Sequence, residues 1–408
     1  QLGVDEEGLG PAVVDDVVDL VGAETEDALA GVDCKMKWTM GPESDAVWYG
    51  HEGEPEPWEP DEDAVCSINY TSGTTARPKG VEQTHRARWI NATTFGWQAA
   101  VTDRDVYLHT LPMFHCDGWG VKHVVLRKVD GPEILRRVRD QGVTLMCGAP
   151  AVCAAVLDAA KDWDGEIPGR GRVRMIVAGA PPPTSTIERM ETELGWEFIQ
   201  IYGLTETAPL LTFNRTRQEW DDLTPGERAQ KLGRAGAPCI GITMKTSESG
   251  ELLAKGNHIL QGYWENPTAT EQALEGGWFH TGDGGYVDAE GYYSITDRKK
   301  DVIISGGENV SSIEVEDALF SHPAVNEVAV IGVPHEKWGE TVKALVVLND
   351  GATATEQELI DFCREKLAHY KCPTSVEVRD ELARTTTGKL QKYKLRAPYW
   401  EGREKQVN

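Results

Sequence analysis

From residue 61 onward, short apolar runs that predict strands alternate with amphipathic stretches that predict helices. The expected strands span residues 65–69, 106–111, 123–126, 143–146, 173–178 and 198–202. The expected helices span residues 133–140, 151–160 and 184–194. This alternation predicts an α/β protein whose large domain has mostly parallel sheets flanked by helices. In such sheets, ligands bind outside the carboxyl ends of the strands.

One connection does not fit this pattern. The strands expected at 106–111 and 123–126 are separated by fewer residues than a parallel crossover with a helix needs, about a dozen or more. Either the two strands are antiparallel neighbours, or residues are absent between Gly120 and Val121. We favour the second alternative.

The chain is expected to divide into a large domain, residues 1–299, and a smaller, mobile α+β domain, residues 300–408. In the smaller domain, helices are expected at 313–320 and 356–367 and strands at 325–332 and 341–348. Near the start of the chain, one helical stripe is expected from Val13, Val14, Val17, Val18 and Val21. Residues 1–60 otherwise carry no chemistry that we can assign.

The charge of the chain excludes some partners. Lysine and arginine number 41 against 66 aspartates and glutamates, which gives a net charge of −25. Such an acidic protein is a poor binder of nucleic acid or anionic membranes, and no apolar run is long enough to span a membrane.

The eight cysteines contain no C-x-x-C pair, so we expect reduced core residues in a cytoplasmic protein.

The stretch from Tyr70 to Gly80, YTSGTTARPKG, follows an apolar run that we expect to be a buried strand. Hydroxyls, flexible backbone and a cation in so short a loop suit a polyphosphate. The residues that carry these groups are Thr71, Ser72, Gly73, Thr74, Thr75 and Lys79. The stretch lacks the spacing of a Walker A loop, G-x-x-x-x-G-K-[ST]. The alternative is an ordinary polar surface loop.

Two more loops follow expected strands, AGAPPP at 178–183 and YGLTET at 202–207. Tyr202 could stack on a base, Thr205 could bind a phosphate, and Glu206 could hold Mg²⁺, which prefers oxygen ligands. The alternative is a capping arrangement in which Thr205 or Thr207 starts a helix. Gly179 and the prolines after it form a rigid wall that could flank a planar base.

Asp283 lies between two glycines in the stretch HTGDG, residues 280–284. A carboxylate can accept hydrogen bonds from both hydroxyls of a ribose diol, so Asp283 is a candidate ribose ligand. The alternative is an Asp-Gly turn.

Five stretches in one order, residues 70–80, 202–209, 282–283, 297–301 and 385–389, together resemble the acyl-adenylate-forming superfamily of acyl-CoA synthetases, adenylation domains and beetle luciferases. The resemblance covers about residues 61–400. Within the superfamily, the stretch LPMFHCDGW at 111–119 is most similar to fatty-acid and methylmercaptopropionate CoA ligases.

The resemblance implies a role for each matching residue. Along the ATP phosphates it places Thr71, Ser72, Gly73, Thr74, Thr75 and Lys79, with Thr205 near the α-phosphate and Glu206 on Mg²⁺. Around the nucleoside it places Gly179, Ala180, Pro181, Tyr202 and Gly203 at the adenine and Asp283 and Arg298 at the ribose. For the remaining steps it implies His115 at the acyl pocket, Lys300 at the hinge, Gly306 and Gly307 at the pantetheine channel, and Lys389 as the adenylation lysine.

The resemblance implies an ATP-dependent acyl-CoA ligase that uses ATP, Mg²⁺ and coenzyme A. We expect its substrate to be a small carboxylic acid, namely a fatty acid. We expect it to bind no nucleic acid and to insert stably into no membrane. A homodimer is possible. No carrier domain follows, so the expected acceptor is a diffusible thiol. An aminoacyl adenylation enzyme, an acyl-AMP-forming enzyme, a luciferase-like oxidase and a nucleotide-binding regulatory protein without turnover remain alternatives.

Three features depart from the family. Ala76 stands where the family usually has glycine, residues 1–60 match the family's N-terminal portion poorly, and the apolar stretch expected after Trp119 is missing.

Overall fold

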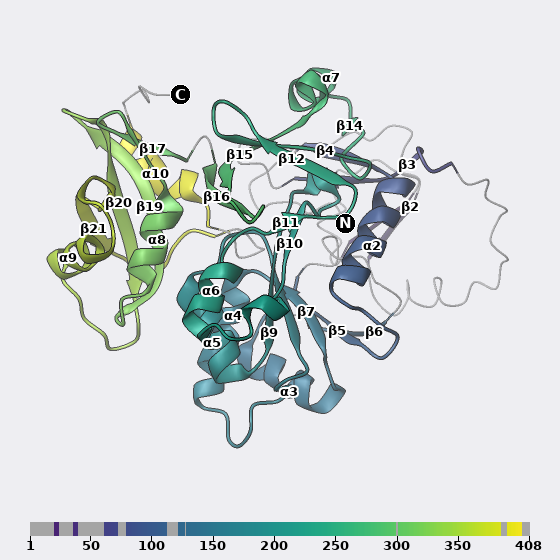
Figure 1. The fold of residues 1–408 in the computed structure, drawn as a ribbon, viewed down its shortest axis with the longest axis horizontal. Coiled ribbons are helices and arrows are strands. Elements are labelled where there is room, and N and C mark those ends of the chain that lie inside the picture. The colour runs from purple at the N-terminus through teal and green to yellow at the C-terminus, as the bar shows by residue number, and fades with distance from the viewer. Residues whose placement is uncertain are drawn as a thin grey trace. The chain divides into compact units, whose positions relative to one another are not determined.

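The computed structural model describes residues 20–23, 36–39, 61–71, 79–111, 121–126, 128–298, 301–384 and 390–401. By its contacts the chain divides into two units, Gln1–Asp61 and Glu62–Asn408 (Figure 1). In the first unit, strands β1 (Leu20–Ala23) and β2 (Met36–Thr39) pair in parallel. Val21 therefore lies in a strand and not in the expected helix, because a β-branched residue that finds a pairing partner favours extended backbone. Residues 13–18 of the expected helical stripe lie outside the described residues.

A seven-stranded sheet, in the order β11-β10-β9-β8-β7-β5-β6, forms the centre of the second unit. Its parallel strands are β5 (Val106–His109), β6 (Lys122–Val125), β7 (Leu145–Gly148), β8 (Arg174–Val177) and β9 (Glu197–Tyr202). Two antiparallel strands, β10 (Thr212–Asn214) and β11 (Ala237–Pro238), complete it. The predicted mixed α/β fold with a mostly parallel sheet is confirmed.

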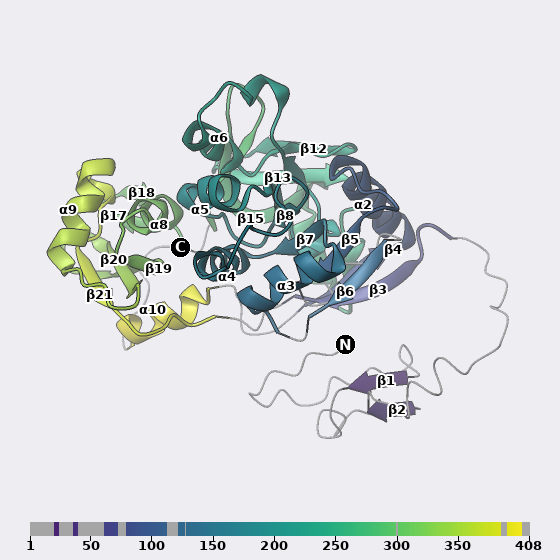
Figure 2. The same ribbon diagram turned by 90° about the horizontal axis from the view of Figure 1, so that it is seen from below.

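Both faces of this sheet are covered, by different kinds of element. One face packs against α3 (Gly131–Gln141), α4 (Pro150–Lys161) and α5 (Thr184–Arg189), through the cluster that contains Met146, Met175 and Phe198. The alternate residues Leu145, Ile176 and Ile199 face α2 (His85–Gln98) and a second sheet. In Figure 2, α3 lies below β7 and β8, and α2 lies above them.

The second sheet has the order β12-β13-β15-β16 and is antiparallel throughout. Its strands are β12 (Ile242–Thr246), β13 (Glu251–Gly256), β15 (Phe279–Val287) and β16 (Tyr293–Arg298). Helices α6 (Pro225–Leu232) and α7 (Pro267–Ala273) lie in the segments before and after its first two strands.

Residues 65–70 occupy a different place from the one expected. Strand β3 (Val65–Tyr70) pairs antiparallel with β4 (Gly80–Thr84), and β4 pairs with β14 (Gly262–Tyr263), in a separate three-stranded sheet. The prediction of a buried strand in the parallel sheet is wrong, since Val65 and Tyr70 are 41% and 39% exposed. An edge strand is paired on one side only, which leaves part of it in solvent. The stretch that we predict to bind phosphate therefore connects two antiparallel strands.

Strands β5 and β6 pair in parallel, with Val106 opposite Lys122. The antiparallel alternative for this pair is wrong. Residues 110–121 join the two strands, and residues 112–120 lie outside the described ranges. Because the two strands are parallel, residues 110–121 have to carry the chain from the end of β5 back to the start of β6.

The last hundred residues form the expected arrangement of strands and helices. A five-stranded sheet contains β17 (Ile303–Ser305), β18 (Glu308–Val310), β19 (Val325–His335), β20 (Gly339–Leu348) and β21 (Ser375–Val378). Its helices are α8 (Ser312–Phe320), α9 (Glu356–Lys366) and α10 (Lys392–Trp400). The apolar side chains of α8 and α9 pack on this sheet around Val330 and Ala344.

Six cysteines fall within the described residues, and no disulfide joins any two of them. Five are buried, as expected, but Cys66 is exposed because it lies on the edge strand β3. Among the described residues, no helix has both the length and the apolar composition needed to cross a membrane.

Candidate functional site

The loop after β9 folds back on itself so tightly that one of its positions has room only for glycine. A Cβ atom at Gly203 would lie 1.6 Å from the carbonyl oxygen of Pro209. Within the loop, the Thr207 hydroxyl accepts the Leu204 N–H at 2.9 Å and donates to the Pro209 carbonyl at 2.7 Å. The capping role considered for this loop therefore belongs to Thr207. Thr205, at the start of a short 3₁₀ turn, is left for another use.

Hydrogen bonds to their backbone carbonyls hold Thr205 and Glu206 in place. Each side chain keeps one polar atom without a partner among the described residues. The Thr205 carbonyl accepts a hydrogen bond from Gln83 in β4, and the Glu206 carbonyl accepts one from Leu260 at 2.7 Å. The Thr205 hydroxyl and Glu206 Oε2 have no hydrogen-bond partner in the part of the chain that the structure describes. The other carboxylate oxygen of Glu206, Oε1, accepts the Tyr263 hydroxyl at 2.9 Å.

The two ends of the hairpin loop are fastened to each other. The Thr71 N–H donates to the Lys79 carbonyl at 2.9 Å, and the Lys79 N–H donates to the Thr71 hydroxyl at 3.3 Å. The Lys79 ammonium lies 4.6 Å from the centre of the Tyr263 ring. Lys79 and Glu206 were both identified from the sequence, and the fold brings them to the same tyrosine.

Sequence analysis missed Tyr263, although it touches two of the predicted site residues. It lies on the two-residue strand β14, outside every stretch that carried the resemblance, and nothing in its residue type indicates a site. The structure does not describe four other predicted members of the phosphate loop, Ser72, Gly73, Thr74 and Thr75.

Tyr202 and Asp283 meet directly, although they come from different sheets. The Tyr202 hydroxyl donates to Asp283 Oδ2 at 2.8 Å, and the two residues are 8% and 5% exposed. Asp283 lies inside the nine-residue strand β15, so the alternative of an Asp-Gly turn is wrong. Arg298 is opposite Asp283 in the strand register, and its side chain lies outside the described residues.

Gly179, Ala180 and Pro181 directly follow β8, whose parallel neighbour β9 ends at Tyr202. Gly179 has φ +90°, a left-handed conformation that favours glycine, and both Gly179 and Ala180 are exposed. Two of the three predicted loops therefore share one edge of the parallel sheet, as expected for a ligand site at the strands' carboxyl ends.

Gly306 and Gly307 form the two-residue turn between β17 and β18, with φ +61° and +90°. A tight hairpin needs positive φ at such positions, so the turn by itself explains why both residues are glycines. Their role in a pantetheine channel stays a prediction. The roles of His115, Lys300 and Lys389 also stay predictions, because these residues lie outside the described ranges.

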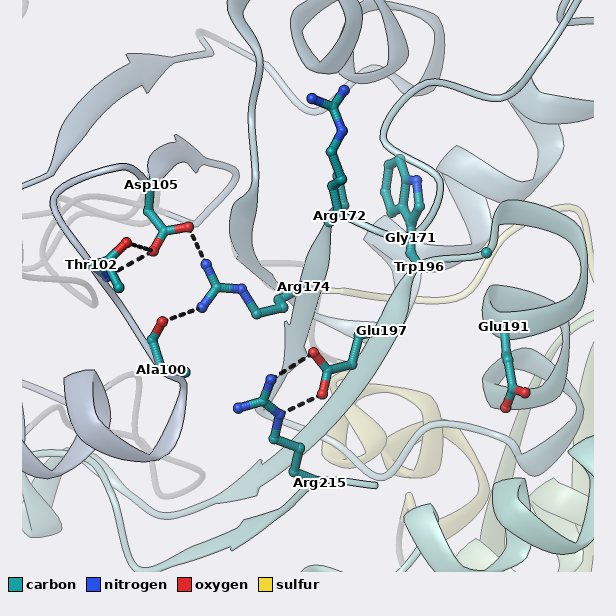
Figure 3. A pocket seen from close by; sticks show the side chains of 12 residues that line it. Ala100, Thr102, Asp105, Gly171, Arg172, Arg174, Glu191, Trp196, Glu197 and Arg215 are labelled. Atoms are coloured by element: carbon teal, nitrogen blue, oxygen red, sulfur yellow. Dashed lines mark hydrogen bonds and ion pairs between the residues drawn. The ribbon is translucent and has the colours of Figure 1, made fainter. Parts of the chain in front are cut away.

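A cavity of about 520 Å³ lies at the opposite edge of the sheet, near the amino ends of β8 and β9 (Figure 3). Two of its three arginines have partners: Arg174 pairs with Asp105, and Arg215 Nη2 lies 2.9 Å from Glu197 Oε2. None of the predicted site residues lines this cavity. It is therefore separate from the candidate site.

Comparison with known proteins shows the family. Residues 10–264 match the model of the AMP-binding enzymes, and residues 314–389 match the AMP-binding enzyme C-terminal domain. The chain is 42% identical over 377 residues to probable acyl-activating enzyme 5, peroxisomal, of Arabidopsis thaliana, covering 86% of this chain and 66% of that protein. It is 41% identical over 357 residues to 4-hydroxybutyrate–CoA ligase 2 of Metallosphaera sedula, covering 82% and 64%.

A solved structure shows the same relationship. The o-succinylbenzoate CoA synthetase from Bacillus subtilis, in complex with its acyl-adenylate intermediate, is 32% identical with a TM-score of 0.71, over 82% of this chain and 69% of that one. The chain spans just under two thirds of the length of the two curated relatives. It belongs to the AMP-binding enzymes, on the CoA ligase branch of the acyl-adenylate-forming superfamily.

Proposed function

We propose that this chain is an ATP-dependent acyl-CoA ligase that activates a carboxylic acid as an acyl-adenylate and transfers the acyl group to coenzyme A. The observation that carries the proposal is the meeting of Lys79 and Glu206 on Tyr263. Thr205, next to Glu206 in the chain, has a hydroxyl without a hydrogen-bond partner among the described residues. A cation, a carboxylate and a hydroxyl at one place provide what binding a metal–polyphosphate complex requires. Membership of the AMP-binding family supports the proposal independently.

The reaction needs positioning and electrostatic stabilisation more than it needs covalent chemistry. A carboxylate is a poor electrophile, so its oxygen first attacks the α-phosphorus of ATP and pyrophosphate leaves. Negative charge then builds on the phosphoryl oxygens and on the leaving group. Lys79, the Thr205 hydroxyl and Lys389 bind these oxygens and oppose that charge, since donors already in place cost no reorganisation during the reaction.

The Glu206 carboxylate is suited to bind Mg²⁺. Oε2 of its carboxylate has no hydrogen-bond partner among the described residues, and Oε1 is fixed by Tyr263. The described residues contain no group of three or more His, Cys, Asp or Glu that could hold a metal. Such a site suits Mg²⁺, which is usually bound through one or two carboxylates together with substrate phosphates. When bound, the ion neutralises phosphate charge.

The nucleoside half of ATP lies at Tyr202, Asp283 and the Gly179–Ala180–Pro181 wall. Asp283 accepts the ribose hydroxyls, while the Tyr202 hydroxyl holds Oδ2 of the carboxylate. Gly203 lets the loop turn closely enough to leave room for the base. Arg298, opposite Asp283 in the strand register, completes the ribose site.

Asp283→Asn is expected to weaken ATP binding by about 10–100-fold, because a hydrogen bond to a charged group contributes roughly 1.5–3 kcal/mol. The measurement is the Kd of ATP by calorimetry. Asp288→Asn is the matched control, since Asp288 pairs with Arg234 and has no role in the proposed site. An unchanged Kd in Asp283→Asn would contradict the ribose assignment.

The second step uses the smaller domain, residues 300–408, turning about Lys300. Adenylation and thioester formation need different residues at one site, and a hinged domain supplies both sets in turn. In the second arrangement Gly306 and Gly307 line the pantetheine channel. The thiol of coenzyme A then attacks the acyl carbon, next to His115, and AMP leaves.

The identity of the acid decides the biological role. A fatty acid is our sequence-based prediction, whereas the relative from Metallosphaera sedula is named for 4-hydroxybutyrate. The assay measures pyrophosphate and AMP release from Mg-ATP with short, hydroxylated, aromatic, medium-chain and long-chain acids, each with and without coenzyme A. Acid-dependent pyrophosphate release, with AMP turnover only in the presence of coenzyme A, is the expected result.

Two other outcomes of this assay would replace the proposal. Pyrophosphate release that coenzyme A never accelerates would identify an acyl-AMP-forming enzyme that delivers to another acceptor. Nucleotide binding without turnover of any acid would identify a regulatory protein. Homodimer formation and a cytoplasmic location stay predictions, and the Arabidopsis relative is named as peroxisomal.

A further inference from the structure

We propose that Tyr263 is the positioning residue of the phosphate site, which aims the Glu206 carboxylate at Mg²⁺ and keeps Lys79 apart from it. The inference rests on the proposed function and assigns a role to a residue outside the motifs of the family resemblance. It is based on two contacts made by one side chain, at its hydroxyl and at its ring.

The Tyr263 side chain is fixed before any ligand arrives. The residue is 8% exposed and packs in a small apolar cluster with Val81, Leu260 and Phe279. Its backbone N–H donates to the Thr270 hydroxyl at 2.8 Å, and β14 pairs with β4 so that Tyr263 is opposite Val81. A side chain with so little freedom can orient the groups that touch it.

The hydroxyl of Tyr263 binds only one of the two carboxylate oxygens of Glu206. It donates to Oε1 at 2.9 Å, and Oε2 is left without a hydrogen-bond partner in the described ranges. One carboxylate oxygen is held in place while the other stays available to a metal.

The ring of Tyr263 separates two opposite charges. The Lys79 ammonium lies 4.6 Å from the ring centre, within the range of a cation–π contact. Within the described part of the chain, Lys79 contacts the ring and Glu206 accepts from the hydroxyl, and no ion pair joins the two residues. Such a pair would neutralise the two groups that phosphate and Mg²⁺ require. The aromatic face gives the ammonium a partner that an incoming phosphate can replace.

The test separates metal-dependent from metal-independent nucleotide binding in the full chain. A non-hydrolysable ATP analogue is titrated calorimetrically with and without Mg²⁺, and the ratio of the two affinities is the readout. Tyr263→Phe keeps the ring under Lys79 and removes the hydrogen bond to Glu206. We expect its metal-free affinity to stay within about twofold of wild type and its Mg²⁺ enhancement to fall about 10–100-fold, the usual cost of losing a partner that orients a metal ligand.

A second variant tests the ring. Tyr263→Leu removes both contacts, so its metal-free affinity is expected to fall as well, because Lys79 can then pair with Glu206. Tyr293→Phe is the matched control: Tyr293 is 6% exposed, and its hydroxyl donates to the Met244 carbonyl at 2.8 Å, a bond that no site residue shares. The control should bind like wild type with and without Mg²⁺.

The outcomes are distinguishable. A Mg²⁺ enhancement in Tyr263→Phe equal to that of wild type overturns the positioning role, although the proposed function would stand. Equal losses with and without Mg²⁺ would indicate general damage to the site and also overturn it. Failure of the wild-type chain to bind the analogue at all would overturn the proposed function and the inference with it.

Discussion

Lys389→Ala is expected to slow acyl-adenylate formation by about 10²–10³-fold and to leave thioester formation from a supplied acyl-adenylate unchanged. The adenylation step builds charge on the phosphoryl oxygens, and one preorganised donor to such charge contributes roughly 3–4 kcal/mol to the transition state. The second step attacks a carbon and releases AMP, so it makes no use of this lysine. The different effects on the two half-reactions are the signature of the assignment.

The two half-reactions are measured separately. Acid-dependent pyrophosphate release reports the first, and CoA-thioester formation from a synthetic acyl-adenylate reports the second. Lys394→Ala is the control, because Lys394 is an exposed residue of α10, five positions further along the chain. Equal losses in both half-reactions, or none in either, would be incompatible with Lys389 as the adenylation lysine.

Lys392→Met is expected to lower the free energy of unfolding by about 3–5 kcal/mol, because it leaves one charge of a buried pair without its partner. The Lys392 ammonium lies 2.8 Å from Glu316 Oε1 and also donates to the Ser312 hydroxyl, and the two charged side chains are only 15% and 18% exposed. Burial alone would lower the pKa of Lys392, but the carboxylates of Glu316 and Asp297 more than offset this and hold it above its ordinary value.

The loss of stability should be recovered by removing the second charge. In the double variant Glu316→Leu/Lys392→Met neither charge of this pair is left, and an apolar pair of similar volume often matches or exceeds a buried ion pair in stability. Denaturant unfolding of the two single variants, the double variant and Lys366→Met measures this directly. Lys366 is a suitable surface control, since its ammonium binds the exposed Ser321 hydroxyl. A double variant no more stable than Lys392→Met would contradict this account.

Several of the expected helices agree closely with the structure because their signals are local. Helix α3, expected at 133–140, spans Gly131–Gln141, and α8 and α9 agree with their expected ranges within one residue. Asp130 caps the start of α3 and Gly142 ends it in a left-handed conformation, and both act through neighbouring backbone groups. Periodicity and caps lie within a few residues of the helix that they define.

The strands show the limit of local signals. Residues 65–69 were correctly expected to be a strand, but their partner is β4 in an antiparallel hairpin and not a strand of the parallel sheet. Val21 satisfied a helical stripe and yet lies in β1, which pairs with β2. The partner of a strand is decided by hydrogen bonds to distant residues, which a local pattern does not contain.

The sequence by itself determined the fold class, the family and the chemical types of the site: the hydroxyl of Thr205, the carboxylates of Glu206 and Asp283 and the ammonium of Lys79. Their identities follow from residue type and motif order, which need no coordinates. The tertiary structure alone decided that Tyr202 holds Asp283 and that Tyr263 lies between Lys79 and Glu206. The first contact joins strands from two different sheets, and the second joins β14 to the residue before β4 and to the 3₁₀ turn after β9. Residues so far apart in the sequence are brought together only by the tertiary fold.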